Sequence, residues 1–526
     1  MGWEIMEGEW PDFKGRIFKK RPKNLVEILE NTVNNSPDLI GFICNERKLT
    51  FKEFDQRSNR IAAGFKKYHV KKGDRVSLLL GNGLEFPLCF FALMKLGAIA
   101  VPLNTRFKGE ELSYEINHSG SKLLVLDEEY WPNIDPVRKD LKTVERIFFN
   151  GQEVPEGVLS FVELNESQEI LEKVRLDETD DAAIMYTSGT TGKPKGAVLY
   201  HRGLIASAMQ VSDFIAYEPK DRIICVAPLF HATGLAMIML SHIFSGIPCV
   251  YMRTFKVKDF LEIMSSEKIT KTIGVINIIW LMINHPEFDR YDFSSFKVAM
   301  FGGSPAAEEM VKGILNKLPH LKISVGYGLT ESHGIVSTTS YEDALRKIEA
   351  AGQLLPLVEA RIVDDEGKEL APNRVGEITL KSPAITKGYW RNPEATQATI
   401  TKGWLHTGDI GKLDDEGYLY ILDRKKDMIN RGGEKIYSLE VENVISRHPK
   451  VLEVAVVGVP DKFFGEAVKA TIVLRTGQTA AEEEFKNFCS GQLADYKVPK
   501  YIEVLDSLPR NPAGKVIKGE LKYIRK

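Results

Sequence analysis

The chain has 526 residues, of which 43% are hydrophobic and 27% charged, and its formal net charge is −2. This length predicts about three to four domain-sized units, and the near-neutral charge excludes nucleic acid as an expected partner. Five cysteines without C-x-x-C spacing exclude a disulfide framework and a zinc cluster, so we expect a protein of the reducing cytoplasm.

Neither the N-terminus nor the longest apolar run predicts a membrane segment. Residues 1–7 are acidic and lack the basic region of a signal peptide. Two prolines and two histidines interrupt the apolar run at 223–252, whereas a spanning helix needs about 20 nearly unbroken apolar residues. We expect buried core at this run and no integral membrane segment, and peripheral contact with a bilayer stays open.

Short β-rich runs alternate with helical patterns in the first 350 residues. A strand at 75–80, a helix at 86–96 and a strand at 98–102 come first. The rhythm returns with strands at 122–126, 222–226, 298–301 and 321–325, and an apolar run at 182–185 precedes a Gly- and Thr-rich segment. Strands separated by helices predict parallel βαβ units with helices on both sheet faces.

The pattern changes after residue 352. Strand-like pieces at 360–363 and 376–380 are separated by Asp-Glu-Gly and Pro-Asn turns, which predicts a small antiparallel or barrel-like unit. A short α/β pattern then resumes, with a helix at 438–447, strands at 453–458 and 467–474, and a helix at 480–493.

Residues 187–196 are the most informative segment. They hold three glycines, three threonines, one serine and two lysines. Glycines let backbone N–H groups approach an anion, and the hydroxyl and ammonium groups add donors and positive charge. A polar surface loop would explain the glycines and threonines but not the paired lysines, so we predict a phosphate-binding loop. It is not a Walker loop, because Lys193 is followed by Pro194 instead of Ser or Thr.

Four further segments carry groups suited to a nucleotide. Residues 302–305 (Gly-Gly-Ser-Pro) follow a strand end, where α/β proteins place ligands, although a tight turn is the favoured explanation of the two glycines taken alone. Residues 326–331 (Gly-Tyr-Gly-Leu-Thr-Glu) offer a ring, a hydroxyl and a carboxylate, and Mg²⁺ prefers such oxygen ligands. Asp409 suits a ribose diol or a cap. Lys515 stands on a Pro/Gly-shaped loop, where a surface lysine is usually only solvated.

Taken in order, residues 186–196, 326–331, 404–409, 423–436 and 511–515 resemble the adenylate-forming superfamily. Its members are acyl-CoA synthetases, aryl-CoA ligases, luciferases and the adenylation domains of peptide synthetases. The resemblance covers nearly the whole chain. Its most specific motifs are Tyr-Thr-Ser-Gly-Thr-Thr-Gly-x-Pro-Lys-Gly and Asn-Pro-x-Gly-Lys.

The resemblance implies an α/β fold with a large, multi-lobed N-terminal domain and a small, mobile α+β C-terminal domain. The N-terminal AMP-binding domain would span 1–423, with parallel α/β lobes at 1–351 and a small β-barrel-like lobe at 352–423. A hinge at 424–427 would join it to the C-terminal domain at 428–526, which carries Lys515.

The resemblance also implies a role for each matching residue. Lys515, Thr330 and His231 would be catalytic, Glu331 would bind Mg²⁺, and Lys426 would be the hinge residue. The ATP and AMP contacts would be Thr187, Ser188, Gly189, Thr190, Thr191, Lys195, Gly303, Ser304, Tyr327, Gly328, Thr330, Asp409 and Arg424. Gly432 and Gly433 would leave room for the pantetheine arm of coenzyme A. The acyl pocket would be lined by His231, Asn277, Gly302 and His333.

The implied reaction is ATP-dependent ligation of a carboxylic acid to a thiol. The acid attacks the α-phosphate of ATP, which gives an acyl-adenylate and pyrophosphate; coenzyme A then takes the acyl group and AMP leaves. Both steps use the same carbon, so the C-terminal domain must rotate between them. Two positions depart from the family pattern, because Ser438 stands where proline is common and Gly519 where a basic residue is frequent.

The acid itself is less constrained than the reaction. Residues 230–235 hold no carboxylate that could pair with an α-ammonium group, so an uncharged acid is favoured. We expect a medium- or long-chain fatty acid, with an aromatic or alicyclic acid as the alternative. Transfer of the acyl group to a carrier protein, a non-catalytic nucleotide-binding role and a homodimer also stay open.

Overall fold

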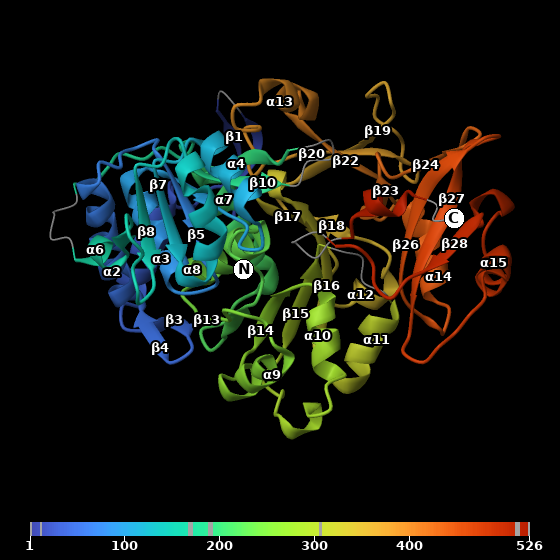
Figure 1. Cartoon of the computed structure of the whole chain (residues 1–526), viewed down its shortest axis with the longest axis horizontal. Coiled ribbons are helices and arrows are strands. Elements are labelled where there is room, and N and C mark those ends of the chain that lie inside the picture. The colour runs from blue at the N-terminus through green and yellow to red at the C-terminus, as the bar shows by residue number, and fades with distance from the viewer. Residues whose placement is uncertain are drawn as a thin grey trace. The chain divides into compact units, whose positions relative to one another are not determined.

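The computed structural model describes residues 3–10, 13–166, 172–187, 193–303, 308–510 and 516–523. The chain divides into two compact units (Figure 1). The first unit comprises Met1–Glu359 and Leu380–Leu405, and the second comprises Ala360–Thr379 and His406–Lys526.

One sheet of the first unit has the strand order β11-β10-β6-β5-β7-β8-β9. Its strands are β5 (Arg75–Leu79), β6 (Ile99–Pro102), β7 (Leu123–Asp127), β8 (Arg146–Asn150), β9 (Leu159–Ser160), β10 (Asp181–Thr187) and β11 (Lys195–Tyr200). The pairs among β5 to β9 are parallel, which confirms the predicted βαβ pattern, and β10 and β11 form an antiparallel hairpin. Both faces are covered, so these strands are nearly continuous apolar runs.

A second sheet of the first unit runs β18-β17-β16-β15-β14-β12-β13-β3-β4. Its strands are β3 (Ile40–Cys44), β4 (Arg47–Thr50), β12 (Ile223–Cys225), β13 (Cys249–Tyr251), β14 (Lys271–Gly274), β15 (Val298–Gly302), β16 (Lys322–Leu329), β17 (Gly334–Thr338) and β18 (Gly352–Leu354). The pairs from β3 through β13, β12, β14 and β15 to β16 are parallel, and the outer pairs are antiparallel.

Helices cover these sheets. They are α1 (Leu25–Asn35), α2 (Phe51–Lys67), α3 (Glu85–Leu96), α4 (Gly109–Ser119), α7 (His201–Ile215), α8 (Leu240–Ser245), α9 (Val257–Ser266), α10 (Ile276–Ile283) and α11 (Glu308–Lys317). Phe260 of α9, Ile279 of α10 and Val311 of α11 share one core with Ile224 and Ile323 of the second sheet. In Figure 1, α10 and α11 lie side by side next to β15 and β16.

Local sequence signals set the helix ends. The Thr50 side chain accepts from the backbone N–H of Glu53, whose carboxylate accepts from the N–H of Thr50, so α2 begins with a capping box. Helix α3 ends at Gly97, whose φ of 66° lies in the left-handed region that favours glycine.

The apolar run at 223–252 forms buried core, as predicted. It contains β12, a π-helical segment η3 (Thr233–Met239), α8 and β13, and most of its side chains are buried. Within the described part of the chain, no helix is long and apolar enough to cross a bilayer.

The expected barrel-like lobe is open. Its strands are β19 (Glu359–Val363), β20 (Gly376–Lys381), β22 (Trp404–Leu413) and β23 (Tyr418–Arg424), and they follow one another in the order β19-β20-β22-β23. The described strands close no barrel, so this part of the fold prediction needs correction. Local turn signals predicted the strands, but closure depends on strand order, which they do not encode.

The rest of the second unit is a small α+β sheet. Its elements are β24 (Ile429–Arg431), β25 (Glu434–Ile436), α14 (Ser438–Ser446), β26 (Val451–Asp461), β27 (Gly465–Leu474), α15 (Glu482–Ser490) and β28 (Tyr501–Val504). Along β26, Val456 faces a core with both helices, whereas Val457 faces Leu508 and Leu521 on the other side. This alternation buries both faces of the strand. The predicted α/β fold class is thereby confirmed.

Short elements complete the chain. They are β1 (Ile5–Glu9), β2 (Lys14–Phe18), α5 (Trp131–Ile134), α6 (Val162–Asn165), α12 (Asp343–Arg346), α13 (Pro393–Thr399), β21 (Ile400–Thr401), and the 3₁₀ turns η1 (Glu128–Tyr130), η2 (Asp135–Asp140), η4 (Phe288–Arg290), η5 (Thr330–Ser332), η6 (Asp495–Lys497) and η7 (Lys518–Leu521).

Candidate active site

The predicted phosphate loop joins the two strands of the β10–β11 hairpin. Thr187 and Lys195 are register partners at the loop end of the hairpin, and the hydroxyl of Thr187 donates to the backbone oxygen of Lys195 at 3.4 Å. The predicted contacts Ser188, Gly189, Thr190 and Thr191 lie outside the described residues. A strand follows the loop, where a Walker loop would be followed by a helix.

Helix α4 contacts the chain on both sides of the phosphate loop. The Tyr186 hydroxyl donates to the backbone oxygen of Glu115 at 3.2 Å and lies 2.8 Å from Nδ1 of His118. At the other end, the Tyr114 hydroxyl donates to the backbone oxygen of Pro194 at 3.2 Å. Burial, with a smaller contribution from nearby cations, lowers the pKa of His118, and burial raises that of Tyr186. Both groups are therefore held neutral at neutral pH.

The predicted magnesium ligand Glu331 lies in the 3₁₀ turn η5, between β16 and β17. Oε1 of Glu331 accepts a hydrogen bond from the hydroxyl of Tyr389 at 2.8 Å, and its backbone oxygen accepts from the N–H of Thr386 at 2.7 Å. Thr330, the predicted catalytic threonine, begins the same turn and is half-buried.

Tyr389 also contacts the hairpin that carries the phosphate loop. The Nζ of Lys195 lies over its ring, 5.2 Å from the centroid. Its backbone forms a bridge with Ala197, and the next N–H, of Trp390, donates to the oxygen of Gly196 at 2.7 Å. Lys195 and Glu331 are two predicted site residues that lie 136 residues apart in the sequence. The structure brings both into contact with one tyrosine. Sequence analysis missed Tyr389; the pair Gly388-Tyr389 after a threonine was the available signal.

The predicted nucleotide contacts Gly303 and Tyr327 and the predicted acyl-pocket residue Gly302 stand at the ends of two neighbouring parallel strands. Gly302 of β15 and Gly326 of β16 are register partners, and strand ends of this kind are where α/β sheets bind ligands. Gly303 has φ of 82°, which favours glycine. A Cβ on Gly328 would lie 2.0 Å from the backbone oxygen of Gly334, so no side chain fits there. Tyr327 is half-buried beside them, and the predicted contact Ser304 lies outside the described residues.

Two predicted acyl-pocket segments meet next to η3. His231 precedes this segment, and its backbone oxygen accepts from the N–H of Leu235 at 2.9 Å. A Cβ added to Gly334 of β17 would lie 3.1 Å from Cγ of Met237 in η3. The side chain of Asn277 is on the exposed surface of α10.

His333 is fully buried and both of its ring nitrogens are engaged. Nδ1 donates to the backbone oxygen of Ala384 at 2.6 Å, and Nε2 accepts from the N–H of Tyr200 at 3.1 Å. Burial lowers its pKa to about 3. The ring is therefore a neutral link between β11 and the segment that leads to Tyr389.

Asn82 fixes the backbone that leads to His231. Its Nδ2 donates to the backbone oxygen of Ala227 at 3.0 Å, and its Oδ1 accepts from the N–H of Leu229 at 3.0 Å. Asn82 lies in the Gly-Asn-Gly segment after β5, and the sequence analysis did not single it out.

In the second unit, Asp409 and Arg424 are register partners on β22 and β23. Nε of Arg424 donates to Oδ1 of Asp409 at 2.8 Å, and Asp409 is only 3% exposed. The Thr407 hydroxyl receives the backbone N–H of Asp409 at 3.0 Å. This arrangement holds a carboxylate and a guanidinium together, as the predicted ribose site requires.

The predicted hinge and coenzyme A residues follow. Lys426 is exposed in the turn after β23, whereas its neighbour Lys425 pairs with Glu377 at 3.2 Å. Gly432 and Gly433, between β24 and β25, have φ of 63° and 96°, so both positions favour glycine. The predicted catalytic Lys515 lies outside the described residues.

Ser438, which replaces a common proline, takes part in a buried network. Its N–H and its hydroxyl both donate to the carboxylate of Asp423, and Nζ of Lys518 donates to its oxygen at 2.6 Å. Lys518 also pairs with Glu442 at 2.8 Å. Burial raises the pKa of Asp423. A proline could not make the N–H bond.

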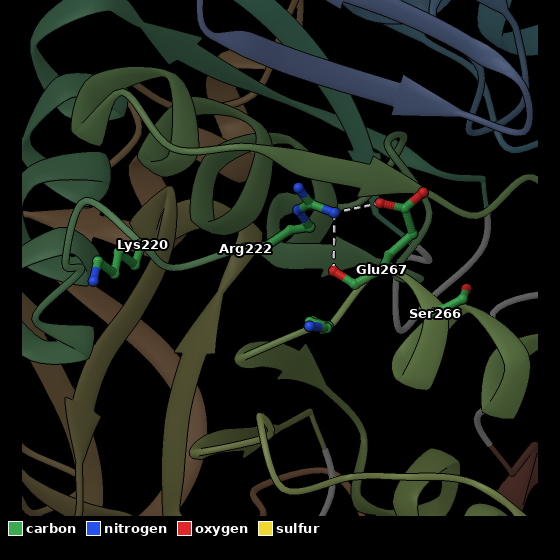
Figure 2. A pocket seen from close by; sticks show the side chains of 5 residues that line it. Lys220, Arg222, Ser266 and Glu267 are labelled. Carbon is green, nitrogen blue, oxygen red and sulfur yellow. Dashed lines mark hydrogen bonds and ion pairs between the residues drawn. The ribbon is translucent and has the colours of Figure 1, made fainter.

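One hollow lies elsewhere in the first unit. It is a cavity of about 230 Å³ lined by Lys220, Arg222, Ser266, Glu267 and Lys268. Figure 2 shows the guanidinium of Arg222 directed at Glu267. It donates hydrogen bonds to the carboxylate of Glu267 and, at 2.9 Å, to the backbone oxygen of the same residue. No predicted site residue lines this cavity.

Known families and proteins are similar to the chain over most of its length. A family model described as AMP-binding enzyme matches residues 29–390, and one described as AMP-binding enzyme C-terminal domain matches residues 440–515. The chain is 35% identical to the long-chain-fatty-acid–CoA ligase FadD13 of Mycobacterium tuberculosis, over 95% of this chain and 98% of that protein.

Solved structures are similar over nearly the whole chain. The anthranilate CoA ligase AuaEII in complex with anthranoyl-AMP has a TM-score of 0.88 and 28% identity, with 95% of this chain and 96% of that chain covered. The o-succinylbenzoate coenzyme A synthetase MenE of Bacillus subtilis, in complex with ATP and magnesium ion, has a TM-score of 0.83 and 31% identity, with 96% and 100% covered.

Proposed function

The chain belongs to the AMP-binding enzyme family, and we propose that it joins a carboxylic acid to coenzyme A through an acyl-adenylate. It is an acyl-CoA synthetase, an AMP-forming acid–thiol ligase. The observation that carries the proposal is the meeting of Lys195 and Glu331 on Tyr389 at the base of the phosphate loop.

In the first half-reaction a carboxylate oxygen attacks the α-phosphate of ATP and pyrophosphate leaves. Negative charge gathers on the phosphate oxygens, so the cation of Lys195 and the predicted cation of Lys515 would stabilise the transition state. Asp409 and Arg424 would hold the ribose hydroxyls and so fix the α-phosphate relative to the acid.

Glu331 fits a magnesium ligand. Its carboxylate is half-buried and one of its oxygens is fixed by Tyr389. Among the described residues there is no cluster of three or more His, Cys, Asp or Glu that could hold a metal. Mg²⁺ is often held by one or two carboxylates together with substrate phosphates. Bound in this way, the ion would neutralise phosphate charge.

We propose a medium- or long-chain fatty acid as the substrate. The segment from His231 to Met239 carries no carboxylate, and its side chains are largely apolar and buried. The similarity to a long-chain-fatty-acid ligase supports this choice, and the similarity to an anthranilate CoA ligase keeps an aromatic acid as the alternative. A panel of acids with coenzyme A, read by AMP release, separates the two.

The second half-reaction needs the thiol at the same carbon. We propose that the domain from residue 428 onward rotates about Lys426. This rotation would withdraw Lys515 and bring Gly432 and Gly433 to the acyl group. An exposed turn residue can absorb the backbone change of a hinge. A cytoplasmic location is part of the proposal, supported by five free, buried cysteines; a homodimer is checked by solution mass.

The test is ATP–pyrophosphate exchange that depends on added acid. Lys515→Ala should lower the exchange rate by about two to three orders of magnitude, because one charged transition-state contact is lost. Lys522→Ala is the matched control: this lysine is exposed and near in sequence, and its loss should leave exchange unchanged. An unchanged rate in Lys515→Ala would refute the adenylation role.

A further inference from the structure

We infer that Tyr389 is a positioning residue that orients the Glu331 carboxylate for its metal and places Lys195 for the phosphates. The inference rests on the proposed function, because it presumes the roles of Glu331 and Lys195. Tyr389 stands in the segment 383–390, which belongs to the same unit as both residues.

The hydrogen bond to Glu331 fixes which carboxylate oxygen is available. Tyr389 donates to Oε1 at 2.8 Å, so the bond restricts rotation of the carboxylate and does not use Oε2. Carboxylates that bind metals are commonly held by an outer hydrogen-bond donor of this kind, which orients the ligand before the metal arrives.

The ring of Tyr389 acts on Lys195. The ammonium lies 5.2 Å from the ring centroid, a distance at which the ring face attracts a cation. The same tyrosine therefore contacts both the carboxylate of Glu331 and the ammonium of Lys195.

The backbone around Tyr389 is held on two sides. The N–H of Val198 donates to the oxygen of Gly388 at 3.0 Å, and the Thr386 hydroxyl donates to the oxygen of Val198 at 2.8 Å. On the other side, the N–H of Thr386 donates to the oxygen of Glu331. The segment is thus tied to β11 and to the η5 turn, and the position of the Tyr389 side chain is fixed by both.

Two variants of Tyr389 separate the positioning role from a purely structural role. Tyr389→Phe keeps the ring and removes the donor to Glu331; Tyr389→Leu removes both. Tyr68→Phe is a matched control, because Tyr68 donates to Oε2 of Glu163 at the same distance of 2.8 Å, in a half-buried setting apart from the predicted site. Glu331→Gln tests the metal role of Glu331 itself.

The measurement is the dissociation constant of ATP by calorimetry, with Mg²⁺ and with EDTA, together with the thermal midpoint of each variant. Tyr389→Phe should weaken binding of magnesium–ATP about tenfold, the lower end of the loss typical for an outer partner of a metal ligand, and leave binding in EDTA unchanged. Tyr389→Leu should also weaken binding in EDTA, because Lys195 loses its ring. Tyr68→Phe should change neither constant.

Three results would overturn the inference. If Tyr389→Phe weakens binding equally with Mg²⁺ and with EDTA, the tyrosine only supports the fold. If Glu331→Gln loses the magnesium effect and Tyr389→Phe keeps it, the orientation role is wrong while the proposed function stands. If Glu331→Gln keeps the magnesium effect, the metal assignment in the proposed function fails and the inference fails with it.

Discussion

Replacing Ser438 with proline should destabilise the second unit, although proline is common at this position in the family. Ser438 is the first residue of α14, where proline is normally favoured. The preceding Tyr437 has an extended backbone, with φ of −89° and ψ of 120°, which a following proline accepts. The expected loss therefore comes from hydrogen bonds and not from a steric clash.

The magnitude follows from the bonds that each variant removes. Ser438→Ala loses the hydroxyl bonds to Asp423 and from Lys518. A hydrogen bond to a charged group contributes about 1.5–3 kcal/mol. Both charged groups keep other partners, because Asp423 retains backbone donors and Lys518 retains Glu442. We therefore expect a total loss of about 2–3 kcal/mol for this variant.

Ser438→Pro also loses the N–H donor to Asp423. One hydrogen bond to a charged group contributes about 1.5–3 kcal/mol, so the folding stability should fall by about that much more. Proline restricts the unfolded chain, which returns about 0.4–1 kcal/mol. The net expectation is that Ser438→Pro is about 1–2 kcal/mol less stable than Ser438→Ala.

Urea unfolding with two probes measures this difference. Five of the six tryptophans lie within the first unit, and Trp404 lies at its edge, at the start of β22. Tryptophan fluorescence therefore follows mainly the first unit, whereas far-ultraviolet circular dichroism follows both units. The dichroism transition should shift to lower urea in the order wild type, alanine, proline, and the fluorescence transition should not move. A proline variant as stable as the alanine variant would refute the hydrogen-bond argument.

Three further predictions concern other sites. Asn82→Ala should destabilise the first unit by about 2 kcal/mol, since two backbone groups lose their partner, and lower thioester formation; an unchanged fluorescence transition would contradict it. Burial raises the pKa of Glu115 well above its ordinary value. The contribution of its protonated carboxyl to folding stability is therefore fully present below pH 4.5 and is lost as the pH rises through the raised pKa. Glu115→Gln should raise the thermal midpoint at pH 8 more than at pH 5. Lys426→Pro should spare pyrophosphate exchange and impair thioester formation; equal loss of both would reject the hinge.

Much of the fold could be predicted because buried parallel strands are local apolar runs. The predicted strand at 75–80 is β5 (Arg75–Leu79), and the predicted helix at 86–96 is α3 (Glu85–Leu96). The described strands form no closed barrel, whereas β22 and β23 pair antiparallel as the alternative predicted. The barrel could not be predicted because closure depends on how distant strands order themselves. Turn residues report the ends of strands and carry no information on their neighbours.

Motifs were enough to propose individual site residues, but the hydrogen-bond partners of these residues could not be predicted from the sequence. Glu331 was recognisable from its motif, but its donor Tyr389 lies 58 residues further along the chain, and no local pattern links them. The family resemblance placed His333 in the acyl pocket. Its two ring bonds to Ala384 and Tyr200 depend on tertiary packing, and that packing makes it a link in the scaffold; its role in the pocket stays a prediction.

The position of Tyr389 explains how one site can hold opposite charges ready for ATP. A direct ion pair between Lys195 and Glu331 would satisfy both groups, and binding ATP and Mg²⁺ would then require breaking it. A tyrosine between them offers the carboxylate a hydrogen bond and the ammonium a ring face, each weaker than a full ion pair. Phosphate and metal can replace or add to these contacts at lower cost. Replacing Tyr389 with a smaller residue would therefore leave room for the inhibitory ion pair, and the loss in magnesium–ATP binding should exceed the sum of the two lost contacts.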